Sequence, residues 1–339
     1  MFIRPLVKLF RSKQLAAALG LKGLLRPFYR ISYLVAAKDS GLLELLSRDL
    51  VRFETLAQTY CRDAKSRKAL EAWLQLGVRL GLLESGAQGY SLKGLARKLA
   101  LPENDATLAL AQEVVGLHQK LILGTPQKLR DGTLWTLDDQ DGELIARSSR
   151  ALEAFQTGAI DRTFPRSGEI RLLEIGCGSA IYIRHAARKN PSLSALGLEL
   201  QPDVAALAGR NIRRWNLQDR VTVETGDIRQ RIPAAAFDVV TLYNNIYYFP
   251  VDERAALLAH VRKFIRPGGF LLLTTCCRGG NVGMELLNLW GAATATGGRL
   301  PHVPEMVRQL HDAGYADVQT ISLIPGDRFY AFRAVAGTA

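Results

Sequence analysis

The fold class of this chain is decided by the stretch RLLEIGCGSA at residues 171–180. Its apolar first half is typical of a buried β-strand, and the glycines that follow allow a tight turn. A helix is expected to begin near Ile181. Because open α/β sheets bind their ligands at the carboxyl ends of the strands, this turn predicts a ligand site.

Alternating strand and helix patterns continue from this stretch to the end of the chain. Further strands are predicted over residues 195–200, 221–228, 237–245 and 270–276. Two late strands, 318–324 and 329–334, are expected to close the sheet as an antiparallel pair. The predicted fold class is therefore α/β, with a Rossmann-like, seven-stranded, mostly parallel sheet in which one strand is antiparallel. A nicotinamide-dinucleotide fingerprint would need a third glycine at Ile181, which disfavours that class.

The region before this domain is mostly helical. Residues 1–103 are interpreted as short helices followed by a hairpin near residues 85–92, an order typical of a winged helix. Residues 104–166 are interpreted as a helical connection that borders the substrate site, and residues 167–339 as the ligand-binding domain. A winged helix can bind DNA, but the third predicted helix is also rich in large apolar side chains, so burial is favoured over nucleic-acid contact.

Composition and charge set wider bounds. The chain has 339 residues, of which 48% are hydrophobic, enough for two domains. Its four cysteines lack metal-ligand spacing, which predicts no metal site and a reducing, cytoplasmic setting. The net charge of +12 is concentrated at the start of the chain, where no signal peptide or membrane span is visible. This basic segment could contact an anionic membrane surface, although a docking helix is the simpler interpretation. Its cationic residues are Arg4, Lys8, Arg11, Lys13, Lys22, Arg26 and Arg30.

The spacing acid, any residue, Gly, any residue, Gly resembles motif I of class I S-adenosylmethionine-dependent methyltransferases, with Ala180 in place of the last glycine. The N-terminal order is similar to the dimerisation domain of small-molecule O-methyltransferases. The resemblance implies S-adenosylmethionine as the cofactor and a homodimer. It also implies that Glu174 lies near the cofactor's amino group, directly or through water. The other cofactor-binding residues that it implies are Gly176, Cys177 and Gly178 at the methionine and ribose, Glu199 and Leu200 at the ribose, Asp227 and Ile228 at the adenine, and Asn244 after the fourth strand.

Methyl transfer needs a base only when the acceptor arrives protonated. In similar O-methyltransferases a histidine after the fourth strand serves as that base, whereas this chain has Tyr247 at the matching position. A tyrosine with a pKa of about 10 is a poor base at neutral pH. We therefore expect an acceptor that is already ionised or intrinsically nucleophilic, with Tyr247 and Tyr248 as the candidate catalytic residues. His118 and His302 are not favoured, and an apolar helix around residues 284–290 is expected to wall the acceptor site.

The predicted function is methylation of a small or lipid-like molecule, at oxygen or carbon. One alternative is a nucleic-acid methyltransferase, which the isoelectric point near 9.7 would suit. The run from Asn244 to Tyr247 lacks the paired prolines of amine-directed base methylases, so nucleic acid is not the favoured partner. The other alternative is a non-catalytic regulator with a DNA-binding winged helix. That alternative would require loss of cofactor binding, whereas Glu199 and Asp227 are both present.

Overall fold

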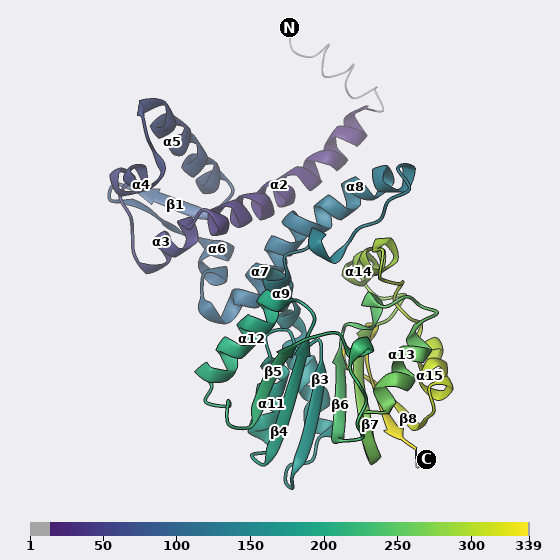
Figure 1. Cartoon of the computed structure of the whole chain (residues 1–339). Helices are drawn as coiled ribbons and strands as arrows, with labels where there is room; N and C mark the ends of the chain where they lie inside the picture. Colours follow the sequence, from purple (N-terminus) through teal and green to yellow (C-terminus); the bar gives the residue numbers. More distant parts are fainter. Residues whose placement is uncertain (1–13, 338–339) are drawn as a thin grey trace. The chain divides into compact units, whose positions relative to one another are not determined.

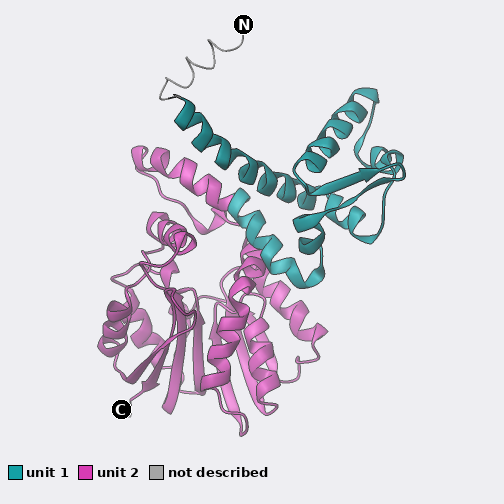
Figure 2. Ribbon diagram, turned by 180° about the vertical axis from the view of Figure 1, so that it is seen from behind, with its two compact units in different colours: residues 1–116 teal, residues 117–339 magenta. Residues whose placement is uncertain are grey.

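The computed structural model describes residues 14–337, which form two compact units that divide between Gly116 and Leu117 (Figures 1 and 2). The predicted connection, residues 104–166, is thus shared between the two units. Arg4, Lys8, Arg11 and Lys13 lie outside the described residues, whereas Lys22, Arg26 and Arg30 lie on α2 (Gln14–Asp39). In the described part of the chain no helix is both long and apolar enough to cross a membrane.

The first unit consists of helices and one small hairpin. Helix α5 begins at a capping box, in which the backbone N–H of Ser66 donates to Asp63 over 2.7 Å. Arg67 on this helix is paired with Glu54, so this cation is partly neutralised. The order of helices and hairpin agrees with the order predicted from the sequence, while the winged-helix assignment stays a prediction. The elements after α2 are α3 (Leu42–Arg48), α4 (Phe53–Tyr60), α5 (Ala64–Arg79), β1 (Leu83–Gly86), β2 (Gly89–Leu92), α6 (Gly94–Leu99) and α7 (Asp105–Glu113).

The second unit is built on a seven-stranded sheet with the order β5-β4-β3-β6-β7-β9-β8. Strand β9 pairs antiparallel with both of its neighbours, and the remaining pairs are parallel, which confirms the predicted fold class. The strands are β3 (Ile170–Ile175), β4 (Leu193–Glu199), β5 (Val221–Thr225), β6 (Phe237–Tyr243), β7 (Ile265–Cys276), β8 (Tyr315–Ser322) and β9 (Phe329–Ala336).

Helices cover both faces of this sheet, because the strands are apolar on both sides. Leu172 packs into the core beneath one helical layer and Leu173 into the core beneath the other. The first layer contains α10 (Glu153–Thr163), α11 (Ile181–Lys189), α12 (Pro202–Arg214) and α14 (Val282–Ala293), and the second contains α13 (Arg254–Arg262) and α15 (Val303–Asp312).

Within the predicted connection, the two helices expected over residues 108–123 and 143–159 are interrupted. A π-helical turn, Val114–His118, separates α7 from α8 (Gln119–Arg130). A 3-10 turn, Ser149–Leu152, separates α9 (Gly142–Ser148) from α10. At the second break the hydroxyls of Ser148 and Ser149 donate to carbonyls three residues earlier, a local bond that competes with a regular helix.

The strand order reverses between β3 and β6. From β3 the chain proceeds to β4 and β5 on one side, and β6 and β7 then extend the sheet on the other side. Adjacent loops at such a switch point leave in opposite directions and open a crevice at the carboxyl ends of the strands. The topology therefore places the ligand site beside residues 176–180 and 244–248.

Candidate functional site

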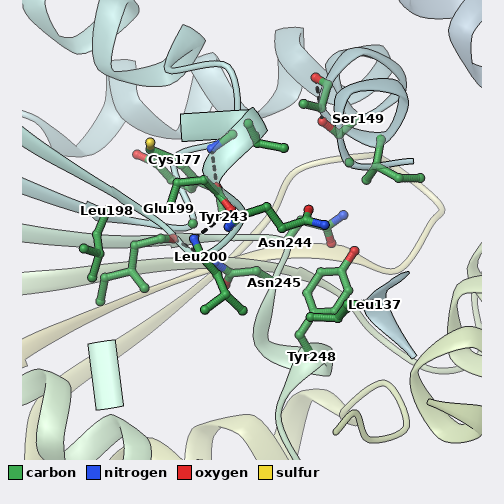
Figure 3. A pocket seen from close by; sticks show the side chains of 18 of the residues that line it. Leu137, Ser149, Cys177, Leu198, Glu199, Leu200, Tyr243, Asn244, Asn245 and Tyr248 are labelled. Carbon is green, nitrogen blue, oxygen red and sulfur yellow. Dashed lines mark hydrogen bonds between the residues drawn. The ribbon is translucent and has the colours of Figure 1, made fainter. Parts of the chain in front are cut away.

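A pocket occupies this switch point, within the second unit. Its volume of about 220 Å³ far exceeds the roughly 10–15 Å³ that one water needs, so it can take an organic ligand. The carboxyl ends of β3, β4, β5 and β6 supply most of the wall. Figure 3 shows Cys177 and Glu199 on one side of it, and Leu137 and Tyr248 on the other.

The glycine turn after β3 forms part of the wall. Gly176 and Gly178 have φ angles of +69° and +54°, in the left-handed region that favours glycine. A Cβ atom on Gly176 would lie 2.6 Å from the side-chain nitrogen of Asn245. Ala180, which replaces the last glycine of the resembled motif, also adopts a φ of +62°. Ala180 therefore adopts a backbone conformation that normally favours glycine. Such strained conformations cluster at functional sites.

Glu199 ends β4 and is tied to this turn. One carboxylate oxygen accepts from the backbone N–H of Gly178 at 2.9 Å. The other accepts from the N–H groups of Leu200 at 2.9 Å and Gln201 at 3.2 Å. Three donors fix the carboxylate at the pocket wall, where its remaining lone pairs can accept from a ligand. The structure thus brings the predicted residues Gly178, Glu199 and Leu200 together.

Asp227 follows β5 and lines the same pocket. Burial acts to raise the pKa of Asp227, but hydrogen bonds from the side chain and backbone of Arg229 outweigh it, so the pKa is lowered. The Arg229 guanidinium lies 2.7 Å from the carboxylate and 5.6 Å from the centre of the Phe249 ring. Arg229 and Phe249 also line the pocket, and the sequence analysis missed both. The only local signal was the two-residue spacing from Asp227 to Arg229.

Glu174 differs from the other predicted cofactor residues because it does not line the pocket. Its side chain is fully buried, and no well-formed hydrogen bond reaches either carboxyl oxygen from a described residue. Burial raises the pKa of Glu174 well above its usual range, against the opposing effect of the nearby Thr241 hydroxyl, and so favours the neutral acid. The hydroxyls of Thr241, Tyr182 and Tyr243 are similarly buried and make no well-formed hydrogen bond to a described residue. We call Glu174 and these three residues the floor cluster.

The end of β6 forms the remaining side of the pocket. The amide of Asn245 donates to the carbonyl of Ile175 at 2.8 Å, and the side-chain oxygen of Asn244 accepts from the N–H of Cys276 at 3.1 Å. Tyr247 and Tyr248 line the pocket, with ring centres 4.7 Å apart. The predicted residues of this segment therefore do face the same space as the glycine turn (Figure 3).

The segment before the sheet also supplies wall residues, and all of them lie between positions 137 and 156: Leu137, Gln140, Gly142, Ile145, Ala146, Ser149 and Gln156. The expectation that α14 walls the site is wrong for this pocket. Met284 and Trp290 are buried in the core, and Thr296, beyond the helix, lines the pocket instead. Neither His118 nor His302 lines the pocket. Across residues 14–337 no group of three or more His, Cys, Asp or Glu side chains could hold a metal ion.

Comparison with known proteins agrees with this geometry. Residues 173–271 match a family model described as a methyltransferase domain, which confirms the resemblance for this part of the chain. The chain is 30% identical over 107 residues to the L-tyrosine C(3)-methyltransferase of Streptomyces lavendulae, a match that spans 32% of this chain and 29% of that protein. It is 28% identical over 171 residues to the tetracenomycin polyketide synthesis 8-O-methyl transferase TcmO of Streptomyces glaucescens, over 49% and 48% of the two chains. The chain thus spans less than half the length of these two curated relatives.

A solved structure extends the likeness to the whole fold. Human N-acetylserotonin methyltransferase, in complex with SAM, superposes with a TM-score of 0.73 over 97% of this chain and 99% of that one. The sequence identity is 16%, so this comparison shows a common fold.

Proposed function

We propose that this protein is an S-adenosylmethionine-dependent methyltransferase that acts on a small molecule, at oxygen or carbon. The observation that carries the proposal is the meeting of the glycine turn, Glu199 and Asp227 at the switch point of the sheet. A ligand with a ribose diol and an exocyclic amine would satisfy both carboxylates at once, because each of its donors would face an acceptor.

The residues present fit this cofactor. Glu199 would accept from the ribose hydroxyls, and Asp227 from the adenine amine, with Leu200, Ile228 and Phe249 as apolar wall residues at that end. Gly176 and Gly178, which line the pocket, would lie beside the methionine part. Glu174 would support the turn from behind rather than touch the ligand. When bound, the cofactor supplies an electrophilic methyl group on a sulfonium.

The side chains on the acceptor side of the pocket are better suited to orienting the acceptor than to removing a proton from it. No histidine lines the described pocket, and the nearby side chains are amides and phenols. We infer that Tyr247, Tyr248, Asn244 and Asn245 orient an acceptor that is already ionised or intrinsically nucleophilic, and that they help to exclude water. The two bacterial relatives are named for C- and O-methylation, which supports a small acceptor methylated at either atom. A lipid-like acceptor is a narrower form of the same proposal.

Calorimetry tests the proposal directly. Purified protein is expected to bind both S-adenosylmethionine and S-adenosylhomocysteine with micromolar affinity, and NAD, the control ligand, much more weakly. A screen of phenols, enols and carboxylic acids with labelled cofactor would then identify the acceptor. Failure to bind either sulfur compound would reject the enzyme proposal in favour of a regulator with a degenerate domain.

We also infer that α2 mediates self-association. Its exposed apolar side chains recur at helical spacing, as expected of a helix face that a second copy covers. These residues are Leu21, Leu24, Leu25 and Phe28. Light scattering after size exclusion should report a dimer that Leu24→Glu converts to a monomer, whereas the exposed control Leu101→Glu should leave it unchanged. A monomeric wild-type protein would contradict this inference.

The same helix suggests an alternative contact. Lys22, Arg26 and Arg30 could lie on an anionic membrane surface, which co-sedimentation with phosphatidylserine vesicles would detect.

The free thiols of all four cysteines support a reducing, cytoplasmic setting.

A further inference from the structure

A second pocket lies on the outer side of the glycine turn, also within the second unit. Its volume of about 530 Å³ is within the range of small-molecule sites. Four arginines from four elements line it: Arg147 on α9, Arg150 in the 3-10 turn, Arg184 on α11 and Arg214 on α12. We call it the arginine pocket.

Part of the positive charge in the arginine pocket has no counter-charge among the described residues. Its single carboxylate, Glu143, pairs with Arg210 at 3.2 Å, and Arg150 pairs with Glu153 at 3.0 Å. In the described part of the chain neither Arg184 nor Arg214 has a carboxylate within 4 Å. Guanidinium groups that converge without counter-charges repel one another, and an anionic ligand would relieve that repulsion.

The geometry also favours a particular kind of anion. The guanidinium of Arg184 lies over the ring of Trp215, 4.6 Å from its centre, which restrains its direction. A planar, oriented guanidinium can donate two parallel hydrogen bonds to one phosphate group. Several such groups around one cavity match the three acceptor oxygens of a phosphate better than the single face of a carboxylate.

The arginine pocket is separate from the first pocket but adjoins it. Ser179 and Ile181 line both, whereas none of the four arginines lines the first. Asn211 lines the arginine pocket and donates to the carbonyl of Ser179 at 3.0 Å. Tyr247, Tyr248 and Thr296, on the acceptor side, do not reach it. A ligand here would therefore be distinct from both the cofactor and the acceptor.

We propose that the arginine pocket binds a phosphate-bearing small molecule, held chiefly by Arg184 and Arg214, at a site separate from the pocket of the methyl donor. The proposal does not depend on methyl transfer, because the pocket, its charges and its donors belong to a different set of side chains. Inorganic pyrophosphate is a suitable probe, since it presents two phosphate groups and no base or sugar.

The test is calorimetric titration of the full chain with pyrophosphate at constant ionic strength. Arg184→Gln and Arg214→Gln should each weaken binding roughly tenfold or more, because each removes charge-assisted hydrogen bonds. Arg213→Gln is the matched control, because Arg213 is exposed on the same helix but does not line the pocket. Because Arg214 is exposed, Arg214→Gln should fold normally. This holds even if Arg184→Gln is destabilised by loss of the stack between Arg184 and Trp215.

Three results would overturn the proposal. One is pyrophosphate affinity that is the same in wild type, Arg184→Gln and Arg214→Gln. Another is mutual exclusion of pyrophosphate and S-adenosylmethionine, which would place the anion in the first pocket. The third is tighter binding of a single-stranded RNA that Arg213→Gln weakens as much as Arg214→Gln, which would indicate a diffuse nucleic-acid surface. Simultaneous binding of cofactor and pyrophosphate, with affinity lost only in the pocket variants, is the expected outcome.

Discussion

Two glutamates near the first pocket, Glu199 at its rim and Glu174 in the floor cluster behind it, have opposite surroundings. Glu199, at the end of β4, accepts from three backbone N–H groups. Glu174, on the neighbouring strand β3, is enclosed and receives no well-formed hydrogen bond from a described residue. The difference comes from position, because the backbone turns at a strand end and presents its N–H groups there, whereas inside the sheet those groups are used by the ladder. The donors that surround a carboxyl group, rather than its residue type, therefore decide whether it can bind a ligand as an anion.

The largest effect is expected at the rim. Glu199→Gln replaces one acceptor oxygen by a donor that faces backbone N–H groups, and it removes the charge that the ribose hydroxyls would meet. We expect a loss in S-adenosylmethionine affinity of about 100-fold, equivalent to about one charge-assisted hydrogen bond. Isothermal calorimetry measures it. Glu224→Gln on β5 is the control, since that side chain is half exposed, pairs with Arg231 and does not line the pocket. Equal losses in the two variants would remove Glu199 from the site.

At the buried Glu174 we expect a free energy of unfolding that depends on pH. Burial raises the folded pKa of Glu174 above its ordinary value of 4.5. The resulting stability is fully present below that value and is lost as the pH rises through the folded pKa, by about 1.4 kcal/mol per pH unit within that window. Glu174→Gln cannot titrate, so it should gain stability relative to wild type as the pH rises above about 5. Denaturant unfolding across this range tests the prediction, and parallel pH curves would contradict it.

Asp227 is intermediate between Glu199 and Glu174, because it lines the pocket but its charge is stabilised by one arginine, Arg229. Asp227→Asn is expected to weaken cofactor binding about tenfold, since the amide retains one acceptor but loses the charge. The lowered pKa of Asp227 has the opposite sign to that of Glu174. Its contribution to stability is present above its ordinary value of 3.8 and is lost as the pH falls through the folded pKa. The stability advantage of wild type over the variant should therefore shrink in acid.

Arg229→Gln distinguishes the contribution of the Asp227–Arg229 ion pair to stability from the contribution of the Asp227 carboxylate to cofactor binding. It removes the ion pair with Asp227 but leaves the carboxylate, so it should reproduce the stability change of Asp227→Asn with a smaller loss of cofactor affinity. If Arg229→Gln weakened cofactor binding more than Asp227→Asn, the arginine rather than the carboxylate would be the ligand contact.

The smallest effect is expected on the acceptor side. Tyr247→Phe should lower turnover roughly fivefold, the value of one neutral hydrogen bond of about 1 kcal/mol, and leave cofactor affinity unchanged. Steady-state kinetics with the identified acceptor and calorimetry with the cofactor together test this split. Tyr330→Phe, on β9 and away from the pocket, is the control. Normal turnover in Tyr247→Phe would make Tyr247 a packing residue.

Much of the cofactor side could be predicted from the sequence. The strand, the glycine turn and the acids at the ends of the next two strands are local patterns, and the carboxyl ends of parallel strands meet at one edge of the sheet. The two broken helices, around residues 114–118 and 149–152, could not be predicted in the same way. Apolar residues continue through both breaks, so the periodicity gave no sign of them.

The sequence by itself determined the fold class, the switch point and part of the pocket wall there, because each depends on short-range pattern and chain order. Only the tertiary structure decided that Glu174 is sealed behind the pocket, that Arg229 holds Asp227, and that four arginines share one cavity. These features depend on how separate segments pack and on how much water remains around each charge. Burial and the distance between charges are properties of the folded chain, so residue spacing alone does not contain them.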